Sequence, residues 1–125
     1  MPRLYHITTA HAWTVARSAG SYCESTRGLS LAEVGFIHCS YARQVPRVAQ
    51  ALYRGASGLV LLVIDPDRLA AELREEDLDG SGEVFPHIYG PLNLDAVIDV
   101  VPFEPAEDGT FTLPAAPDAE APTAW

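Results

Sequence analysis

The longest uninterrupted apolar stretch of the chain, Leu59–Ile64, limits the fold more than any other feature of the sequence. It has the length of a β-strand and falls far below the roughly 18 apolar residues that a membrane-spanning helix needs. Successive side chains of a strand point to opposite faces, so a run that is apolar throughout needs other elements packed on both faces. We therefore predict a central buried strand over residues 58–65 and no membrane-spanning segment.

The segments on either side of this run alternate between strand and helix patterns. Residues 3–8 and 36–40 have the alternating faces of strands, and a helical pattern follows each of them, as far as Ala19 and Tyr53. After the central strand, further strands are predicted over residues 73–75, 95–103 and 111–113. This order is typical of an α+β domain.

The ends of the two predicted helices carry recognisable signals. Thr8 or Thr9 can cap the first helix, and Gly20 can end it. Proline is tolerated only in the first turn of a helix, so Pro46 places the regular start of the second helix near Val45.

The chain divides into a folded part and a tail. Residues 1–113 are predicted to form a single α+β domain, and residues 76–83, which are acidic and contain two glycines, are predicted to form a mobile loop within it. Residues 114–125 are rich in alanine and proline and contain no branched aliphatic side chain. Such a composition predicts a disordered tail.

The net charge of the 125-residue chain is −9. Residues 1–54 have a net charge of +4 and residues 55–125 one of −13. An acidic protein repels DNA and long RNA, because binding of these polymers depends on neutralising phosphates. The basic N-terminal half remains suited to a small phosphorylated ligand.

The two cysteines, Cys23 and Cys39, are too few for a disulfide framework, which favours a reducing compartment with both thiols free. The N-terminus lacks the basic and then apolar pattern of a signal peptide. We therefore expect a cytoplasmic protein, with its protein partners and oligomeric state left open.

Two predicted strand ends share the pattern apolar-His-x-hydroxyl, with His6 and Thr8 in the first and His38 and Ser40 in the second. The two-residue period of a strand places each histidine and its hydroxyl on the same face. A helix start follows each pair, and its free N–H groups favour an anion. Imidazole and hydroxyl groups beside such a helix start suit a phosphate or a ribose hydroxyl.

Further candidate ligand-binding residues lie elsewhere in the chain. His87 and Tyr89 share one face of a strand if that segment is extended, and Arg43 and Arg47 are close enough in sequence to His38 to hold a phosphate. Each histidine alone is also compatible with a structural, buried role.

No metal site is predicted. Neither Cys-x-x-Cys nor His-Glu-x-x-His spacing supports a zinc site built from Cys39, His6, His38 and His87. Cys39 faces away from His38 on a strand, so the two do not form a nucleophilic pair.

Four segments together resemble the bacterial family called domain of unknown function 952. The resemblance spans residues 3–103 and rests on Leu-Tyr-His-Ile-Thr at 4–8, Gly-Phe-Ile-His-Cys-Ser at 35–40, Leu-Leu-Val-Ile-Asp-Pro at 61–66 and Phe-Pro-His-Ile-Tyr-Gly-Pro-Leu-Asn-Leu at 85–94. This family is similar in fold to the ADP-ribosyltransferases, in which two small mixed or antiparallel sheets, flanked by two or three helices, form a cleft that holds NAD.

The resemblance implies roles for particular residues. Tyr5 and His6 are similar to the first transferase motif, in which a histidine contacts a ribose hydroxyl of NAD. Residues 36–40 are similar to the second strand motif of the RNA 2′-phosphotransferases, whose histidine and hydroxyl residue lie in the cleft. A glutamate of the third motif orients the nucleophile in many transferases, but residues 89–96 contain none, and Glu83 lies on the predicted loop.

The leading hypothesis is a cleft that binds NAD, ADP-ribose or another phosphorylated small molecule. His6 would anchor a ribose, His38 would supply an acid, a base or a phosphate contact, and Tyr89 would stack on an aromatic ring. The full set of candidates is His6, His38 and His87 for catalysis and Tyr5, Thr8, Ser40, Arg43, Arg47 and Tyr89 for ligand binding.

Three functions remain open at this stage. The first is ADP-ribosyl or phosphoryl transfer by positioning and electrostatic stabilisation, with NAD as a substrate rather than a bound cofactor. The second is a metal-independent phosphoesterase in which His6 and His38 shuttle protons. The third is a ligand-binding or protein-interaction module without catalytic activity.

Overall fold

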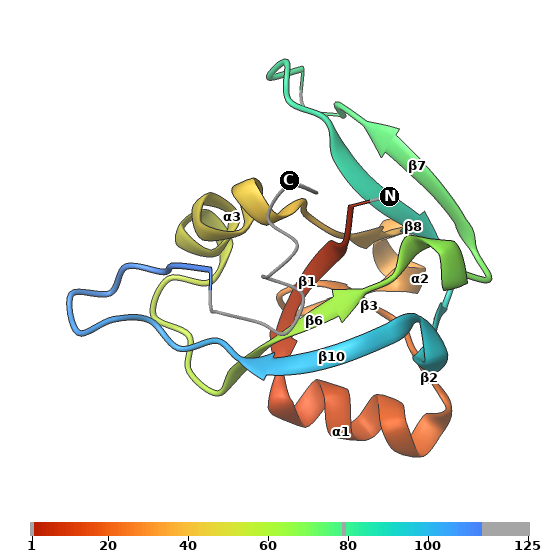
Figure 1. The fold of residues 1–125 in the computed structure, drawn as a ribbon, viewed down its shortest axis with the longest axis horizontal. Helices are drawn as coiled ribbons and strands as arrows, with labels where there is room; N and C mark the ends of the chain where they lie inside the picture. The colour runs from red at the N-terminus through yellow and green to blue at the C-terminus, as the bar shows by residue number, and fades with distance from the viewer. Residues whose placement is uncertain (1, 79, 114–125) are drawn as a thin grey trace.

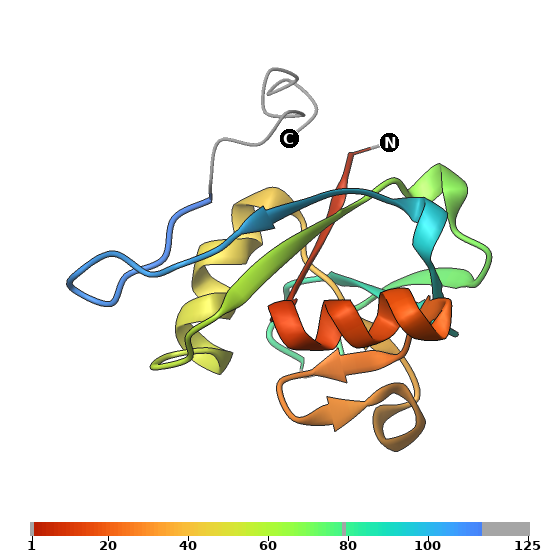
Figure 2. The ribbon, with the colours of Figure 1, turned by 90° about the horizontal axis from the view of Figure 1, so that it is seen from below.

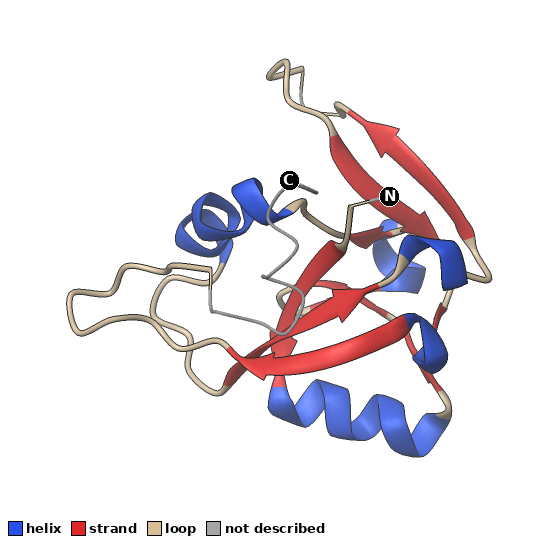
Figure 3. Cartoon of the chain, in the orientation of Figure 1, coloured by secondary structure: helices blue, strands red, loops and turns tan. Residues whose placement is uncertain are grey.

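The computed structural model describes residues 2–78 and 80–113, and within them the fold is mixed α+β (Figures 1 and 3). Three α-helices are present in this part of the chain, α1 (Ala10–Ala19), α2 (Leu31–Val34) and α3 (Val45–Leu52). The strands are β1 (Leu4–Thr9), β2 (Ser21–Tyr22), β3 (Glu24–Thr26), β4 (Leu29–Ser30), β5 (Ile37–His38), β6 (Leu59–Ile64), β7 (Glu72–Glu76), β8 (Phe85–Tyr89), β9 (Leu92–Asn93) and β10 (Val97–Pro102).

The apolar run of the sequence forms the middle strand of a three-stranded antiparallel sheet, as predicted. β6 lies between β1 and β10 and pairs with both. Leu61 and Val63 pack with α3 in one core, whereas Leu62 and Ile64 pack in a second core that includes Ala16 of α1. The alternation of the strand thus divides one apolar segment between two cores.

A second three-stranded sheet, in the order β5-β8-β7, lies next to the first one, and an isolated β-bridge connects β1 to the residue Ser40 that follows β5. Tyr5 of β1 and Ser40 exchange two backbone hydrogen bonds of 2.8 Å. In Figure 1 the β7–β8 pair rises away from β1 and β6, so the two sheets diverge beyond this contact. Two further sheets of two strands each, β2-β9 and β3-β4, complete the fold.

The helix termini follow the signals in the sequence. Of the two predicted caps for α1, Thr9 is the one used, and its Oγ1 accepts a hydrogen bond of 3.0 Å from the N–H of Ala12. Gly20 ends the helix at a φ of +94°, a conformation that costs glycine little. Figure 2 shows α1 below β6 and β10, with the orange β3–β4 segment beyond it.

Three expectations about secondary structure need correction. The strand predicted over residues 36–40 is shorter, because pairing with β8 gives way to pairing with β1 at Ser40. Residues 111–113 form no strand; instead the Phe111 ring packs 5.2 Å from the Phe103 ring in the core. The predicted loop 76–83 begins one residue later, since Glu76 belongs to β7.

Two further predictions concern the C-terminal tail and membrane-spanning segments. The predicted tail, residues 114–125, lies outside the described residues. In the described part of the chain, no helix is both long enough and apolar enough to cross a bilayer.

Candidate functional site

The two main sheets separate beside His6, and a small pocket lies at that point. Beyond the Tyr5–Ser40 contact, the Nδ1 of His6 donates a hydrogen bond of 2.7 Å to the carbonyl oxygen of His38. A side chain therefore replaces the backbone pairing that would otherwise continue between the strands. The pocket is lined by Tyr5, His6, His38 and Ser40 among others, and its volume of about 10 Å³ is room for about one water molecule.

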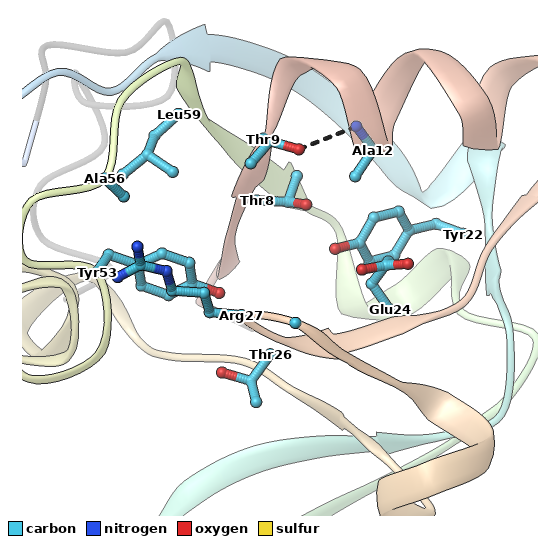
Figure 4. A pocket seen from close by; sticks show the side chains of 11 residues that line it. Thr8, Thr9, Ala12, Tyr22, Glu24, Thr26, Arg27, Tyr53, Ala56 and Leu59 are labelled. Carbon is cyan, nitrogen blue, oxygen red and sulfur yellow. Dashed lines mark hydrogen bonds between the residues drawn. The ribbon is translucent and has the colours of Figure 1, made fainter.

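A larger pocket adjoins the small one, because Thr26 and Tyr53 line both. Its volume of about 70 Å³ is room for about five water molecules. Figure 4 shows that the side chains of Thr8, Tyr22, Glu24, Thr26, Arg27 and Tyr53 surround this space. We refer to the two pockets together as the crevice.

His6 lines the small pocket and is 2% exposed. Its Nδ1 faces the carbonyl oxygen of His38, which can only accept, so Nδ1 carries a proton. Burial is the main cause that lowers the pKa of His6 to about 4; the hydrogen bond to the His38 carbonyl oxygen raises this pKa, and the charge of the His38 ring, a smaller effect, lowers it. The neutral ring therefore offers a lone pair at Nε2, which accepts a hydrogen bond of 2.6 Å from the hydroxyl of Tyr22.

Tyr22 and Tyr53, the two tyrosines of the large pocket, are held in their neutral form. Burial raises the pKa of Tyr22 and of Tyr53 above the ordinary value of a phenol. The hydroxyl of Tyr53 donates a hydrogen bond of 3.0 Å to the carbonyl oxygen of Ile7. Both phenolic protons are thus used within the protein.

A series of three ionisable side chains leads to the crevice from the β5-β8-β7 sheet. The Nδ1 of His87 lies 2.9 Å from Oε1 of Glu76, and the Nε2 of His87 lies 3.4 Å from Nδ1 of His38. Tyr89 donates a second hydrogen bond, of 2.6 Å, to the same oxygen of Glu76. The half-buried His38 then lines the small pocket.

Strand register brings this series together. His38 lies directly opposite His87 in the β5–β8 pair, and Glu76 lies opposite Phe85, two residues from His87 on the same face of β8. Ile37 and Ile88 occupy the opposite face and are fully buried in the core. The alternation therefore holds the acidic and imidazole groups on one face while the other face fixes the sheet.

Aromatic and cationic side chains cover the outer part of the series. The ring of Phe36 stacks on His87 with 4.1 Å between centroids and an interplanar angle of 24°. The guanidinium of Arg74 lies 4.3 Å from the centroid of the Tyr89 ring. The pKa of Tyr89 is raised, mainly because its hydroxyl donates a hydrogen bond to the Glu76 carboxylate.

Protonation of His38 is disfavoured in the folded chain. Burial is the larger cause that lowers its pKa to about 4, and the charge of His87 contributes in the same direction. The buried Cys39 next to it is also held neutral, since burial raises the pKa of its thiol. The imidazole of His38 is therefore a neutral hydrogen-bonding group near neutral pH.

Most of the residues predicted from the sequence fall in or beside the crevice. Tyr5, His6, His38 and Ser40 line the small pocket, and Thr8 lines the large one. Two others, His87 and Tyr89, reach it only through the series that ends at His38.

The two predicted arginines lie elsewhere. Arg43 is exposed on the short 3-10 helix η1 (Ala42–Gln44), and Arg47 forms an ion pair with Glu83. Neither of them lines the crevice, where Arg27 supplies the guanidinium instead.

Sequence reasoning missed five residues of the site, namely Tyr22, Glu24, Thr26, Arg27 and Tyr53 of the large pocket. It also missed Glu76, the carboxylate that orients His87. The alternation of Glu72, Arg74 and Glu76 indicates a strand with its charged side chains on one face. The sequence does not show which strand lies opposite, so it could not place Glu76 beside His87. Among the described residues, no three His, Cys, Asp or Glu side chains are grouped to hold a metal ion.

Comparison with known proteins identifies relatives of this chain. The crystal structure of protein CC0527 from Caulobacter crescentus has a TM-score of 0.77 at 30% identity, covering 89% of this chain and 94% of that chain. The solution NMR structure of the same protein has a TM-score of 0.68 at 29% identity, covering 90% and 94%. No curated protein matches the chain. Residues 7–100 match the family described as Protein of unknown function (DUF952), and the chain therefore belongs to this family.

Proposed function

We propose that the protein is a transfer enzyme that binds a ligand of the NAD and ADP-ribose class in the crevice, with His38 as its proton acceptor. The single observation that carries this proposal is the Glu76–His87–His38 series ending at the small pocket. An ADP-ribosyltransferase-like arrangement of the two diverging sheets is part of the same proposal. Thr8 and Ser40 would then contact the ligand rather than react with it, while His6 would hold the Tyr22 hydroxyl in place.

The Glu76–His87–His38 series compensates for the low basicity of His38. A buried imidazole whose pKa is lowered to about 4 is a weak base. When Nε2 of His38 takes a proton from a substrate, the proton on Nδ1 can move to Nε2 of His87 across 3.4 Å. The positive charge then rests on His87, whose Nδ1–H already points at the Glu76 carboxylate.

The proposed reaction balances without a metal or an oxidant. An acceptor O–H or N–H attacks C1′ of the ribose in NAD, the bond from C1′ to nicotinamide breaks, and nicotinamide leaves with the bonding electron pair. The acceptor proton passes to His38 and on toward His87. The protein contributes positioning and the placement of one charge, both of which are recognised sources of rate acceleration.

The phosphoesterase with two equivalent histidines has less support. His6 is 2% exposed, and both of its ring nitrogens are hydrogen-bonded inside the protein. A proton-shuttling histidine needs one nitrogen for the substrate. The geometry favours an anchoring role for His6 and leaves His38 as the histidine suited to acid–base work.

The experiment is a ligand titration followed by a product assay. NAD and ADP-ribose, each at millimolar concentration, are expected to shift the backbone amide NMR signals of His38 and Ser40 and to raise the melting temperature. Release of nicotinamide from NAD is then measured for the wild type, His38→Gln and His11→Gln, the last being an exposed histidine on α1.

Three results would separate the hypotheses. Loss of nicotinamide release in His38→Gln but not in His11→Gln supports the transfer enzyme. Ligand binding without any product, in every variant, supports a binding module instead, and no response to either ligand rejects the proposed ligand class.

A further inference from the structure

We infer that the large pocket of the crevice holds sugar hydroxyl groups, while a phosphate of the same ligand lies at its edge beside Arg27. This inference rests on the proposed function for the general ligand class. It deepens that function by assigning the part of the ligand that enters the pocket, and it follows from the direction in which the protons of the pocket walls point.

The two phenols of the pocket have their protons turned away from the space between them. Tyr22 donates its proton to Nε2 of His6, because Nδ1 of that ring is already committed as a donor to the carbonyl oxygen of His38. Tyr53 donates its proton to the carbonyl oxygen of Ile7. Neither phenol therefore has a proton left for a ligand.

The other polar walls add to this excess of acceptors. The Thr8 hydroxyl hydrogen-bonds to Tyr22, and the Thr26 hydroxyl and the backbone N–H of Arg27 hydrogen-bond to Tyr53, whose oxygen is thereby supplied with donors from the protein. A threonine that donates to a phenol keeps its own lone pairs for the pocket. The carboxylate of Glu24, which also lines the space, is an acceptor only.

A wall rich in lone pairs selects a ligand group that donates. A phosphate dianion offers only acceptors and would face the Glu24 carboxylate, so it is disfavoured inside the pocket. An ammonium group would face the Arg27 guanidinium, which lines the same space. Neutral hydroxyl groups satisfy both conditions, since they donate to the threonine oxygens, Tyr22 and the Glu24 carboxylate and accept from the arginine.

The size of the pocket and the position of Arg27 place the rest of the ligand. About 70 Å³ holds a pair of neighbouring hydroxyl groups but not a nucleobase. Arg27 uses Nη1 for the carbonyl oxygens of Leu52 and Arg54, each at 3.3 Å. Its Nε and Nη2 have no hydrogen bond within residues 2–78 and 80–113, and they are suited to a phosphate attached to the same sugar.

The test compares three probes by NMR titration of the full chain: D-ribose 5-phosphate, 2-deoxy-D-ribose 5-phosphate and inorganic phosphate. We expect D-ribose 5-phosphate to shift the amide signals of Thr26, Arg27 and Gly28. The 2-deoxy sugar phosphate lacks one hydroxyl group, and we expect it to bind about tenfold or more weakly than D-ribose 5-phosphate, because a buried acceptor then lacks its partner. Inorganic phosphate is expected to bind more weakly than either sugar phosphate.

Variants assign the effect to the pocket wall. Tyr22→Phe and the partly exposed Thr26→Val are expected to reduce the preference for ribose over 2-deoxyribose to about twofold or less, a change that a missing hydrogen bond accounts for. Arg27→Met is expected to weaken both sugar phosphates by a similar factor. Thr14→Val, on the exposed face of α1, is the matched control and is expected to change neither value.

Equal affinity for the two sugar phosphates in the wild type, or tighter binding of inorganic phosphate, would overturn the inference. If ADP-ribose still shifts the amide signals of His38 and Ser40 when the sugar phosphates show no such preference, the proposed ligand class stands and only the sugar-site inference fails. If ribose is preferred but NAD yields no nicotinamide, the sugar site stands and the proposed transfer reaction fails.

Discussion

The hydroxyl of Tyr22 lies 2.6 Å from Nε2 of His6, and each of these two side chains is at most 2% exposed. With the imidazole neutral, Nε2 accepts the phenolic proton, whereas a protonated ring would donate its Nε2–H to the phenolic oxygen and turn the Tyr22 proton away. The direction of this hydrogen bond therefore depends on the protonation state of His6.

Acidification is expected to destabilise the protein through His6. Burial lowers its pKa from 6.5 to about 4. Between these two values the unfolded chain binds a proton that the folded chain does not, so the free energy of unfolding falls as the pH falls through this window. The contribution of His6 corresponds to about 3 kcal/mol. Urea unfolding at about pH 7, 6, 5 and 4 measures it.

Two variants serve as the comparison. His6→Gln keeps a donor and an acceptor but no titratable ring, so the pH dependence is expected to become shallower. It does not vanish, since burial also lowers the pKa of His38 to about 4. His11→Gln, exposed on α1, is expected to keep the wild-type slope. A slope in His6→Gln equal to that of the wild type would contradict the buried neutral ring.

The close contact between Gly90, which follows β8, and Ala71, which precedes β7, gives a second prediction. A Cβ atom added to Gly90 would lie 2.8 Å from the Cβ atom of Ala71, well inside the normal carbon–carbon contact of about 3.5–4.0 Å. Gly90→Ala is expected to lower the free energy of unfolding by about 1–3 kcal/mol. Urea unfolding of this variant, and of Gly90→Ala combined with Ala71→Gly, measures the clash.

The double variant is expected to recover part of the loss. The clash is removed, but the φ of +156° at residue 90 remains unfavourable for alanine. Full wild-type stability in the single variant Gly90→Ala would show that the two segments are farther apart than described.

Features set by neighbouring residues were predictable from the sequence. The apolar run Leu59–Ile64 could only be satisfied as a strand covered on both faces, and it is the middle strand of its sheet. Gly20 ended the first helix because the left-handed conformation is inexpensive for glycine. The family resemblance was confirmed by the match over residues 7–100.

Features set by strand register were not predictable in the same way. Glu76 was assigned to a mobile acidic loop, because an Asp- and Glu-rich segment with glycines has that composition. Only the pairing of β7 with β8 puts its carboxylate beside His87. Arg47 was likewise placed at a ligand by its closeness in sequence to His38, whereas Glu83 is its partner in the structure.

Gln44 fixes the start of α3 to the segment before β8, which gives a third prediction. It is 1% exposed; its Oε1 accepts from the Tyr41 N–H at 2.9 Å, and its Nε2 donates to the Val84 carbonyl oxygen at 2.9 Å. Gln44→Leu keeps the volume but removes the partner of the Tyr41 N–H and of the Val84 carbonyl oxygen, two partly buried hydrogen bonds, at an expected cost of about 1–2 kcal/mol. Thermal and urea unfolding measure this cost.

The control for Gln44 is the nearby Gln50, whose one hydrogen bond, to Gly109, is longer at 3.4 Å. Gln50→Leu is expected to change the free energy of unfolding by less than about 0.5 kcal/mol. If Gln44→Leu is as stable as Gln50→Leu, the buried hydrogen bonds of Gln44 do not stabilise the fold.

The last prediction concerns the direction of the protons in the Glu76–His87–His38 series. A carboxylate can only accept, so Glu76 is expected to keep the proton of His87 on Nδ1, 2.9 Å away. Long-range ¹H–¹⁵N spectra of the imidazole rings report which nitrogen carries the proton. In Glu76→Ala the Nε2–H form of His87 is expected to gain population, and the signals of His38 are expected to shift with it across the 3.4 Å contact. Glu72→Ala, four residues away on the same face of β7, is expected to leave both rings unchanged, because Glu72 pairs with Arg74. Unaltered His87 and His38 spectra in Glu76→Ala would mean that the carboxylate does not orient the series, and the proposed proton path to His87 would then lose its acceptor for the charge.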